Sequence, residues 1–177
     1  MNVFILCTGR CGSTTFIKAC SHITNYSSAH ESRTGFIGEE RLNYSANHIE
    51  ADNRLSWFLG KLENKYGNKA IYVHLKRDEI HTAKSFMNRY DTGIIAAYAN
   101  AIIMKRSPEL TPFNICIDYV RSVNLNIEHF LRDKTMKMNF SLENAKTDFK
   151  LFWEMIRAEG SLISALADWD NNYNQSL

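Results

Sequence analysis

Residues 3–15 read Val-Phe-Ile-Leu-Cys-Thr-Gly-Arg-Cys-Gly-Ser-Thr-Thr, and this stretch decides which fold we expect. Its first five residues form a continuous apolar run that is bounded by Gly9, which is typical of a fully buried strand. The glycines that follow allow a tight turn, and the hydroxyl residues after them open a helix predicted over residues 14–21. The stretch therefore predicts a strand, a turn and a helix in immediate succession.

The turn between this strand and this helix carries groups that bind a phosphate-like anion. Gly9 and Gly12 let the backbone bend and direct N–H groups at one point, and a helix N-terminus favours negative charge. Arg10 adds a fixed positive charge with a fork of donors. The other candidate residues of the loop are Cys11, Ser13, Thr14 and Thr15. The alternative is a turn that merely joins the strand to the helix.

The spacing excludes two other phosphate-binding loops. The Walker motif needs a lysine directly after its second glycine, and Ser13 stands there instead. Cysteine phosphatases need an arginine six positions after the cysteine, but Cys7 is followed at that distance by Ser13 and Cys11 by Ile17. A nucleotide-dependent kinase is therefore a weaker alternative.

Strands alternate with helices along the rest of the chain. We predict further strands over residues 25–29, 70–75 and 136–140. We predict further helices over residues 52–66, 78–90, 93–106, 112–131 and 149–156, the last ended by Gly160. This order predicts an α/β layered fold with a mostly parallel sheet, in which ligands bind beyond the carboxyl ends of the strands.

Two predictions concern which side chains are buried. In the helix that Asp78 caps, the residues expected to face inward are Ile80, Ala83, Met87 and Tyr90. His74 lies within an apolar strand, so we expect it to be a core residue rather than a ligand.

Length and charge limit what the chain binds. Its 177 residues, 45% of them hydrophobic and 23% charged, fit a single domain, 1–177. The net charge is +2, but residues 51–106 carry +5 and residues 107–177 carry −3. A modestly basic centre fits a small anionic ligand and argues against a nucleic-acid partner, which usually needs a basic stripe.

We expect neither a membrane segment nor a secretory signal. The longest mostly apolar stretch, residues 93–104, is shorter than the ~20 residues that a span needs. The apolar run at residues 3–7 is too short for the core of a signal peptide. The four cysteines follow no metal-binding spacing, so we expect reduced thiols, no metal site and a cytoplasmic location.

The loop at residues 9–14 resembles the 5′-phosphosulfate loop of sulfotransferases that use 3′-phosphoadenosine 5′-phosphosulfate (PAPS) as donor. That loop reads approximately Pro-Lys/Arg-Ser/Thr-Gly-Thr/Ser-Thr/Ser after the first strand. Here Arg10 takes the basic position, Cys11 the small one, and Gly12-Ser13-Thr14 the remainder. The chain thus resembles a short, carbohydrate-type member of this family, of the kind found in bacteria.

A second element carries the same resemblance. Sulfotransferases place an arginine just after a central strand and a serine eight residues later, and both hold the 3′-phosphate of the donor. In this chain the strand over residues 70–75 leads to Arg77, and Ser85 follows eight residues on. The alternative is that Arg77 is a surface arginine and Ser85 a solvated helix serine, neither of which binds a phosphate.

The resemblance implies a P-loop-NTPase-like sulfotransferase fold with three layers, a central sheet flanked by helices. It implies PAPS as donor, PAP (adenosine 3′,5′-bisphosphate) as product, and no metal. Arg10 would stabilise the transferring sulfonate, Ser13 and Thr14 would hold the 5′-phosphate, and Lys84 and Arg89 would add to the field that attracts the donor. The sequence departs from the family at Thr15, where cytosolic members carry a tryptophan that stacks on adenine, and it lacks their C-terminal glycine-containing loop.

Sulfuryl transfer to a hydroxyl also needs a base, and the family uses a histidine or a glutamate. Glu31, soon after the second predicted strand, is our first candidate and His30 the second. The alternative is that Glu31 forms a structural ion pair with Arg33.

The acceptor is expected to be a carbohydrate or a small molecule. Aromatic residues that could line its pocket are Tyr26, Phe36, Tyr44 and Trp57. Besides a kinase, the alternative function is a nucleotide-binding module without catalysis. The sequence predicts no particular oligomeric state.

Overall fold

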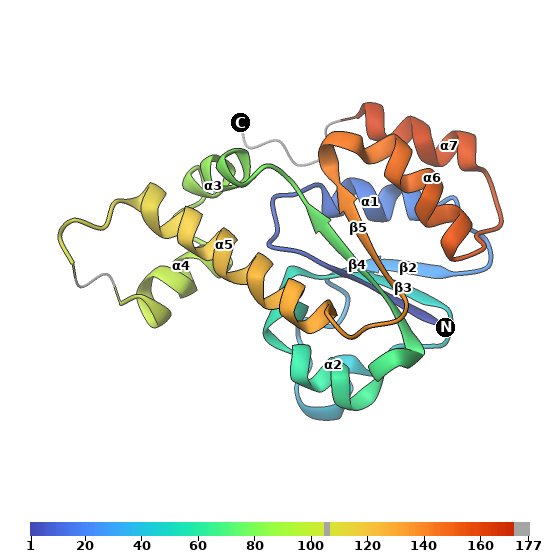
Figure 1. The fold of residues 1–177 in the computed structure, drawn as a ribbon, viewed down its shortest axis with the longest axis horizontal. Coiled ribbons are helices and arrows are strands. Elements are labelled where there is room, and N and C mark those ends of the chain that lie inside the picture. The colour runs from blue at the N-terminus through green and yellow to red at the C-terminus, as the bar shows by residue number, and fades with distance from the viewer. Residues whose placement is uncertain (105–106, 172–177) are drawn as a thin grey trace.

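A computed structural model describes residues 1–104 and 107–171 and shows a sheet of five strands (Figure 1). The strands are β1 (Asn2–Leu6), β2 (Ser27–His30), β3 (His48–Ala51), β4 (Ala70–Lys76) and β5 (Lys137–Ser141). Their order in the sheet is β2-β3-β1-β4-β5, and every neighbouring pair is parallel. The predicted α/β fold with a mostly parallel sheet is therefore confirmed.

Helices cover both faces of the sheet, as Figure 1 shows. The α-helices are α1 (Ser13–Cys20), α2 (Leu59–Lys65), α3 (Glu79–Met87), α4 (Gly93–Ala97), α5 (Pro112–Leu131), α6 (Ala145–Met155) and α7 (Leu162–Ala167). Short 3₁₀ turns are η1 (Gly38–Leu42), η2 (Asn53–Trp57), η3 (Gly67–Lys69), η5 (Leu142–Asn144) and η6 (Asp168–Asp170), and η4 (Tyr98–Ile102) is a π-helical turn. None of the described helices combines the length and the apolar character needed to cross a membrane.

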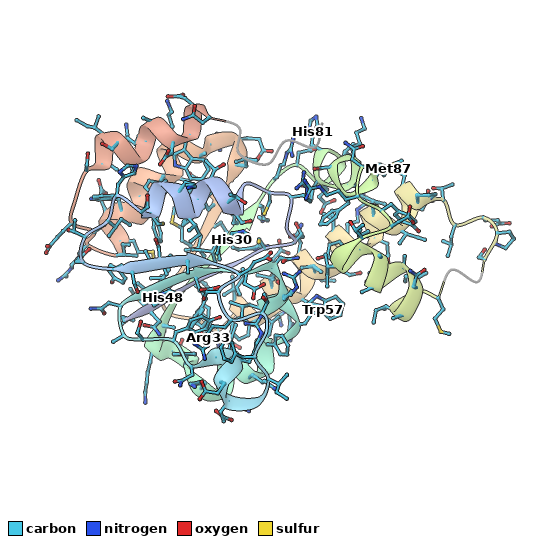
Figure 2. All side chains as sticks on the ribbon, turned by 180° about the vertical axis from the view of Figure 1, so that it is seen from behind. His30, Arg33, His48, Trp57, His81 and Met87 are labelled. Carbon is cyan, nitrogen blue, oxygen red and sulfur yellow. The ribbon has the colours of Figure 1, made fainter. Side chains whose placement is uncertain are left out.

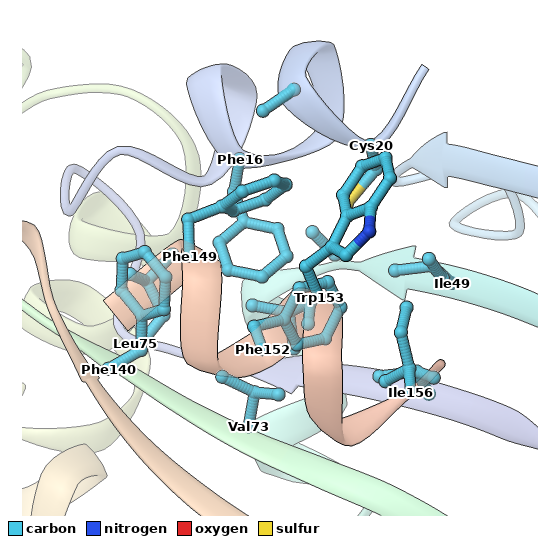
Figure 3. Packing of buried hydrophobic residues seen from close by; sticks show 14 of the residues in the cluster. Phe16, Cys20, Ile49, Val73, Leu75, Phe140, Phe149, Phe152, Trp153 and Ile156 are labelled. Atoms are coloured by element: carbon cyan, nitrogen blue, oxygen red, sulfur yellow. The ribbon is translucent and has the colours of Figure 1, made fainter. Parts of the chain in front are cut away.

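The two faces of β1 and β4 each support a hydrophobic core, because the continuous apolar runs of these strands leave no polar face. On one side α1 and α6 pack on the sheet and α7 packs on these two helices, and Phe16 of α1 lies at the centre of an aromatic cluster (Figure 3). The Phe16 ring centroid lies 5.0 Å from those of Phe140 and Phe152 and 5.5 Å from that of Phe149. On the other side, a second core begins around Phe4, Leu6 and Tyr72 of the sheet and continues between α5 and the helix α3 that packs on it. This arrangement gives the three layers that the resemblance implied.

One strand of the sheet escaped prediction. β3 contains His48 and Glu50, and both are buried despite their polarity. The Glu50 carboxylate receives hydrogen bonds from the Ser32 N–H at 2.7 Å and from the Ser32 hydroxyl at 2.6 Å, and it lies 3.0 Å from His48 Nε2. These bonds replace the hydration that a buried carboxylate loses. A pattern of apolar residues cannot detect a strand that is buried by such tertiary contacts.

The single helix predicted over residues 52–66 is wrong. It consists of the turn η2 followed by α2, and Phe58 between them has φ −120° and ψ 24°, outside the helical region. The Asp52 carboxylate accepts a hydrogen bond from the Arg54 N–H at 2.8 Å, which starts η2 directly after β3. β3 therefore ends at Ala51, and η2 begins at Asn53, where the long helix was predicted.

The helix that Asp78 caps is α3, as predicted, but its buried face differs from the prediction. The Asp78 carboxylate accepts a hydrogen bond from the His81 N–H at 2.8 Å. Ala83 is buried and Tyr90 partly buried, as predicted, but Ile80 and Met87 are about 40% exposed, and Thr82 and Phe86 are buried in their place. α3 packs on α5, so its buried face is set by that neighbour rather than by the apolar residues nearest its ends.

The remaining helices agree in part. α5 begins at Pro112 as predicted, with Thr111 as its cap. The helix predicted over residues 93–106 is interrupted, since α4 gives way to η4, and residues 105–106 lie outside the described part of the chain. The predicted late helix is α6, but α7 and η6 follow it over residues 162–170 without having been expected.

His74 of β4 is a core residue, as predicted, and it makes the fold sensitive to acid. It is fully buried, its Nε2 lies 3.2 Å from Asn124 Oδ1, and burial lowers its pKa from 6.5 to about 4. In the unfolded chain the imidazole takes up a proton near pH 6.5, but in the folded protein it does so only near pH 4. Stability from this residue is therefore complete above pH 6.5 and is lost as the pH falls towards 4, by about 3 kcal/mol.

We therefore expect His74→Asn to show a smaller loss of unfolding free energy between pH 6.5 and 4 than the unsubstituted protein. Urea unfolding at several pH values measures this difference. His129→Asn, at an exposed position of α5, is the control and keeps the full loss. Parallel pH curves for the unsubstituted protein and His74→Asn would contradict the prediction.

Candidate functional site

The carboxyl ends of β1, β2, β3 and β4 lie along one edge of the sheet because all four strands are parallel. A cleft of about 1060 Å³ opens at this edge. The predicted site residues that line it are Gly9, Arg10, Gly12, Ser13, Thr14, Thr15, His30, Glu31, Arg77 and Ser85. His30 at the end of β2 and His81 on α3 both lie at this cleft and are labelled in Figure 2. Nearly all of the predicted site residues thus meet in one place.

Three residues of the loop after β1 have a positive φ, which lets the backbone turn sharply. These are Gly9 at +84°, Arg10 at +59° and Gly12 at +91°. A side chain on Gly12 would bring a Cβ within 2.6 Å of Leu142 Cδ1, so this glycine serves both the turn and the close packing of the loop. The left-handed conformation of Arg10 costs about 1–2 kcal/mol in backbone strain.

The surrounding structure holds this loop in place. The Tyr119 hydroxyl of α5 donates a hydrogen bond to the Thr8 carbonyl at 2.8 Å, and the Thr8 hydroxyl donates to the Gly9 carbonyl at 2.8 Å. Arg77 Nη1 donates to the Arg10 carbonyl at 3.4 Å. The conformation of the loop is therefore fixed by α5 and by the end of β4.

α1 starts immediately after the loop and points its N-terminus into the cleft. Gly12 is its cap residue and provides no side-chain hydrogen bond, and the first turn of the helix contains no acidic residue. The first N–H groups of a helix have no partner within the helix, and the helix dipole favours an anion there. Ser13, Thr14 and Thr15 add hydroxyls in this turn, so the position fits a phosphate or sulfonate group.

The loop after β1 and the helix α3 meet through one hydrogen bond. Arg10 Nε donates to Ser85 Oγ at 3.0 Å, although the two residues are 75 positions apart in the sequence. With Arg77 bonded to the Arg10 carbonyl, the residues predicted for two different phosphate groups form one connected set.

The cleft is strongly basic. Among the described residues that line it, five carry positive charge, Arg10, Arg54, Arg77, Lys84 and Arg89, and only Glu31 carries negative charge. Burial lowers the pKa of Arg10, and the charges of Arg89 and Arg77 lower it further. Guanidinium groups that repel one another in this way favour a bound polyanion.

Cys11, another predicted loop residue, lies in the core behind the loop and not in the cleft lining. It is fully buried, like Cys7, and the four cysteines are free thiols, as expected. A hydrogen bond between the two thiols raises the pKa of Cys7 and lowers that of Cys11. Cys11 is therefore placed to shape the loop rather than to touch a ligand.

His30 and Glu31 lie side by side at the end of β2, with different partners. His30 Nε2 lies 3.0 Å from Ser13 Oγ, which ties it to the loop and α1. Glu31 has a positive φ of 53° and donates its N–H to the Ala51 carbonyl at 3.0 Å. Its carboxylate forms an ion pair with Arg54 at 2.8 Å.

The alternative pairing of Glu31 with Arg33 is wrong. Arg33 Nη2 lies 2.9 Å from Glu40 Oε2, and its guanidinium stacks 4.4 Å from the Phe36 ring centroid. Because the chain turns directly after β2, the Glu31 side chain reaches Arg54 and the Arg33 side chain reaches Glu40.

Three residues after the missed strand β3 also belong to the site. Asn53 and Arg54 line the cleft, and Asp52 lies fully buried behind them in an ion pair with Arg41. Asn53 also packs on the loop, since its Nδ2 donates to the Thr8 carbonyl at 3.5 Å. The sequence did contain a signal for this strand end: Asp52 and Asn53 follow Ile49 and Ala51, and an Asp-Asn pair favours a turn after a strand.

The aromatic residues predicted for an acceptor pocket are not among the described residues that line the cleft. Tyr26 donates its hydroxyl to the Ile156 carbonyl at 3.3 Å, and Tyr44 stacks on His48 with centroids 5.2 Å apart. Phe36 and Trp57 are exposed. The aromatic side chains of the described lining are instead Phe86 and Trp169.

Comparisons with known proteins place the fold. No family model matches the chain, and no curated protein matches its sequence. Among solved structures, a sulfotransferase domain from the curacin biosynthetic pathway matches with a TM-score of 0.64 at 12% sequence identity. The alignment covers 96% of this chain and 78% of that one. The chain therefore has a sulfotransferase-like α/β fold.

Proposed function

We propose that this protein is a PAPS-dependent sulfotransferase that transfers a sulfuryl group to a hydroxyl of a carbohydrate or other polar small molecule. The observation that carries the proposal is the hydrogen bond from Arg10 to Ser85, which joins two anion-binding elements in one basic cleft. A donor with phosphate groups at both its 3′ and 5′ positions needs such a pair of sites. The sulfotransferase-like fold supports the same assignment.

Each element of the cleft has a role in this reaction. The N-terminus of α1, with Ser13 and Thr14, holds the 5′-phosphate, and Arg77 with Ser85 holds the 3′-phosphate. Arg10, in the loop beside both phosphate sites, stabilises the charge that develops on the sulfonate and the leaving phosphate. Sulfuryl transfer on this site requires no metal ion, since Arg10 and the helix N–H groups supply the positive charge.

The acceptor hydroxyl must lose its proton as the new S–O bond forms. Glu31 and His30 are the candidates to take it, because both line the cleft beside the loop. Glu31 remains the first candidate and His30, which is bonded to Ser13, the second. The polar wall formed by Glu31, Asn53 and Arg54 favours a polar acceptor over a phenol.

If the donor sites are as proposed, PAP should stabilise the protein more than AMP or ATP with Mg²⁺ does. At a hundredfold excess over its Kd, a ligand adds about 2.7 kcal/mol to the unfolding free energy, which raises the Tm by roughly 5–10 °C in a protein of this size. Thermal melting with each nucleotide measures the difference.

Arg77→Gln should reduce the shift with PAP to that with AMP, because it removes the 3′-phosphate site. Arg121→Gln is the matched control, since Arg121 pairs with Glu79 on the surface and does not line the cleft. Equal shifts for PAP and AMP in the unsubstituted protein would remove the case for Arg77 and Ser85. A larger shift with ATP and Mg²⁺ would favour a kinase.

A further inference from the structure

Arg54 and Glu31 form an ion pair across two neighbouring strand ends. β2 and β3 are paired in parallel, so the residues that follow them lie next to each other at the edge of the sheet. Arg54 Nη1 lies 2.8 Å from Glu31 Oε2, and the two side chains are 38% and 35% exposed in the cleft. The pair is thus accessible to a ligand and is part of the cleft wall.

The position of Arg54 is fixed from the core side. Its N–H donates to Asp52 Oδ1 at 2.8 Å, and its Nη1 donates to Asn53 Oδ1 at 3.4 Å. Asp52 is fully buried and is itself ion-paired with Arg41, which is only 2% exposed. This chain of contacts connects the Arg54 guanidinium to buried groups, so it can hold a partner in one place.

Glu31 needs such a partner because of its surroundings. It is the sole carboxylate among the described residues that line the cleft, and Arg10, Arg77 and Arg89 line the same cleft. Without a fixed counter-charge, the carboxylate would be drawn to these arginines when the donor is absent and repelled by the donor when it is bound. Either displacement removes it from the acceptor.

We propose that Arg54 is a positioning residue, which holds the Glu31 carboxylate on the acceptor wall and away from the donor-binding arginines. This inference rests on the proposed function, because it assigns Glu31 to the acceptor and the arginines to the donor. Arg54 acts through Glu31, so every effect of its removal must disappear when Glu31 is also replaced.

Binding of PAP tests the inference without any acceptor. Arg54→Gln releases the carboxylate to compete for the donor arginines, and we expect the Kd of PAP to rise roughly tenfold. In the double variant Glu31→Gln with Arg54→Gln, the Kd should return to within about twofold of the Glu31→Gln value. Isothermal titration calorimetry gives all the constants, and Arg121→Gln, which removes another exposed arginine–glutamate pair, should leave the Kd unchanged.

Turnover provides the second measurement. With PAPS and a carbohydrate acceptor, Arg54→Gln should lower kcat roughly tenfold. Arg54→Lys keeps the charge and should recover most of this loss. In the Glu31→Gln background, Arg54→Gln should cause no further loss of kcat, whereas a residue with its own contact to the substrate would cause one.

The outcomes separate the two proposals. Failure of the unsubstituted protein to bind PAP overturns the proposed function and this inference with it. Binding of PAP that is weakened equally by Arg54→Gln in both backgrounds overturns the inference alone, as does an unchanged Kd in Arg54→Gln. Melting curves for each variant confirm that the compared proteins are folded.

Discussion

Glu31→Gln should turn over PAPS and acceptor about 10²–10⁴ times more slowly than the unsubstituted protein, the usual contribution of a general base. Glutamine keeps the size of the side chain and its capacity to accept a hydrogen bond from Arg54, but it cannot take the proton of the acceptor hydroxyl. The affinity for PAP should barely change, because the proposed function assigns Glu31 to the acceptor and not to the donor. Steady-state kinetics with calorimetry of PAP binding measures both quantities.

His30→Asn is the matched comparison, because His30 lies beside Glu31 and also lines the cleft. We expect it to cost less turnover than Glu31→Gln and to weaken PAP binding slightly, since it removes the contact with Ser13. A larger loss of kcat in His30→Asn than in Glu31→Gln would reverse the assignment of the base. Near-normal turnover in Glu31→Gln would exclude Glu31 from proton transfer.

Gly160→Ala should be among the most destabilising single substitutions in the described chain. Gly160 has φ +128°, and a Cβ there would lie 2.1 Å from the carbonyl oxygen of His22. That oxygen belongs to the backbone, which pairs with residues 160–161 between α1 and α7, so neither partner can move away cheaply. Strain and overpacking together should cost about 3 kcal/mol or more, and should lower the Tm by roughly 6–12 °C.

Gly60→Ala is the control for this substitution. Gly60 lies in α2, and a Cβ there would meet nothing within 4 Å. Alanine favours a helix over glycine, so this variant should be up to about 1 kcal/mol more stable than the unsubstituted protein. Similar melting temperatures for the two alanine variants would contradict the packing described for Gly160.

The parts of the fold that were predicted correctly are those whose burial follows from their own residues. β1 and β4 are continuous apolar runs, and the loop between β1 and α1 carries its glycines and hydroxyls at fixed spacing, so the placement of Arg10 and Ser13 at the cleft could be predicted. Arg77 was placed in the same way, at the carboxyl end of β4. In each case a local pattern specifies the local structure.

The parts that were missed depend on partners elsewhere in the chain. Glu50 of β3 is buried because its carboxylate accepts hydrogen bonds from Ser32 and lies against His48, and Arg54 reaches the cleft because Asp52, directly after β3, starts a turn. The alternative role for Glu31 was an ion pair with Arg33, which lies near it in the sequence, whereas the partner that Glu31 has in space is Arg54. Pairing across adjacent parallel strands joins residues that sequence spacing does not relate.

The order in which the cleft and the core are encoded has a consequence for synthesis on the ribosome. Apart from Leu142, Trp169 and Asn171, the described residues of the cleft lie within the first 95 positions, but the helices that cover Phe16 begin only at Ala145. A nascent chain that already contains these cleft residues therefore still exposes an aromatic face of α1 to the solvent. β5 must also pair with β4, which lies more than 60 positions earlier in the chain. Contacts between such distant segments favour slow folding and transient exposure of apolar surface. The surface that such a nascent chain exposes is therefore the aromatic face of α1 and not the cleft.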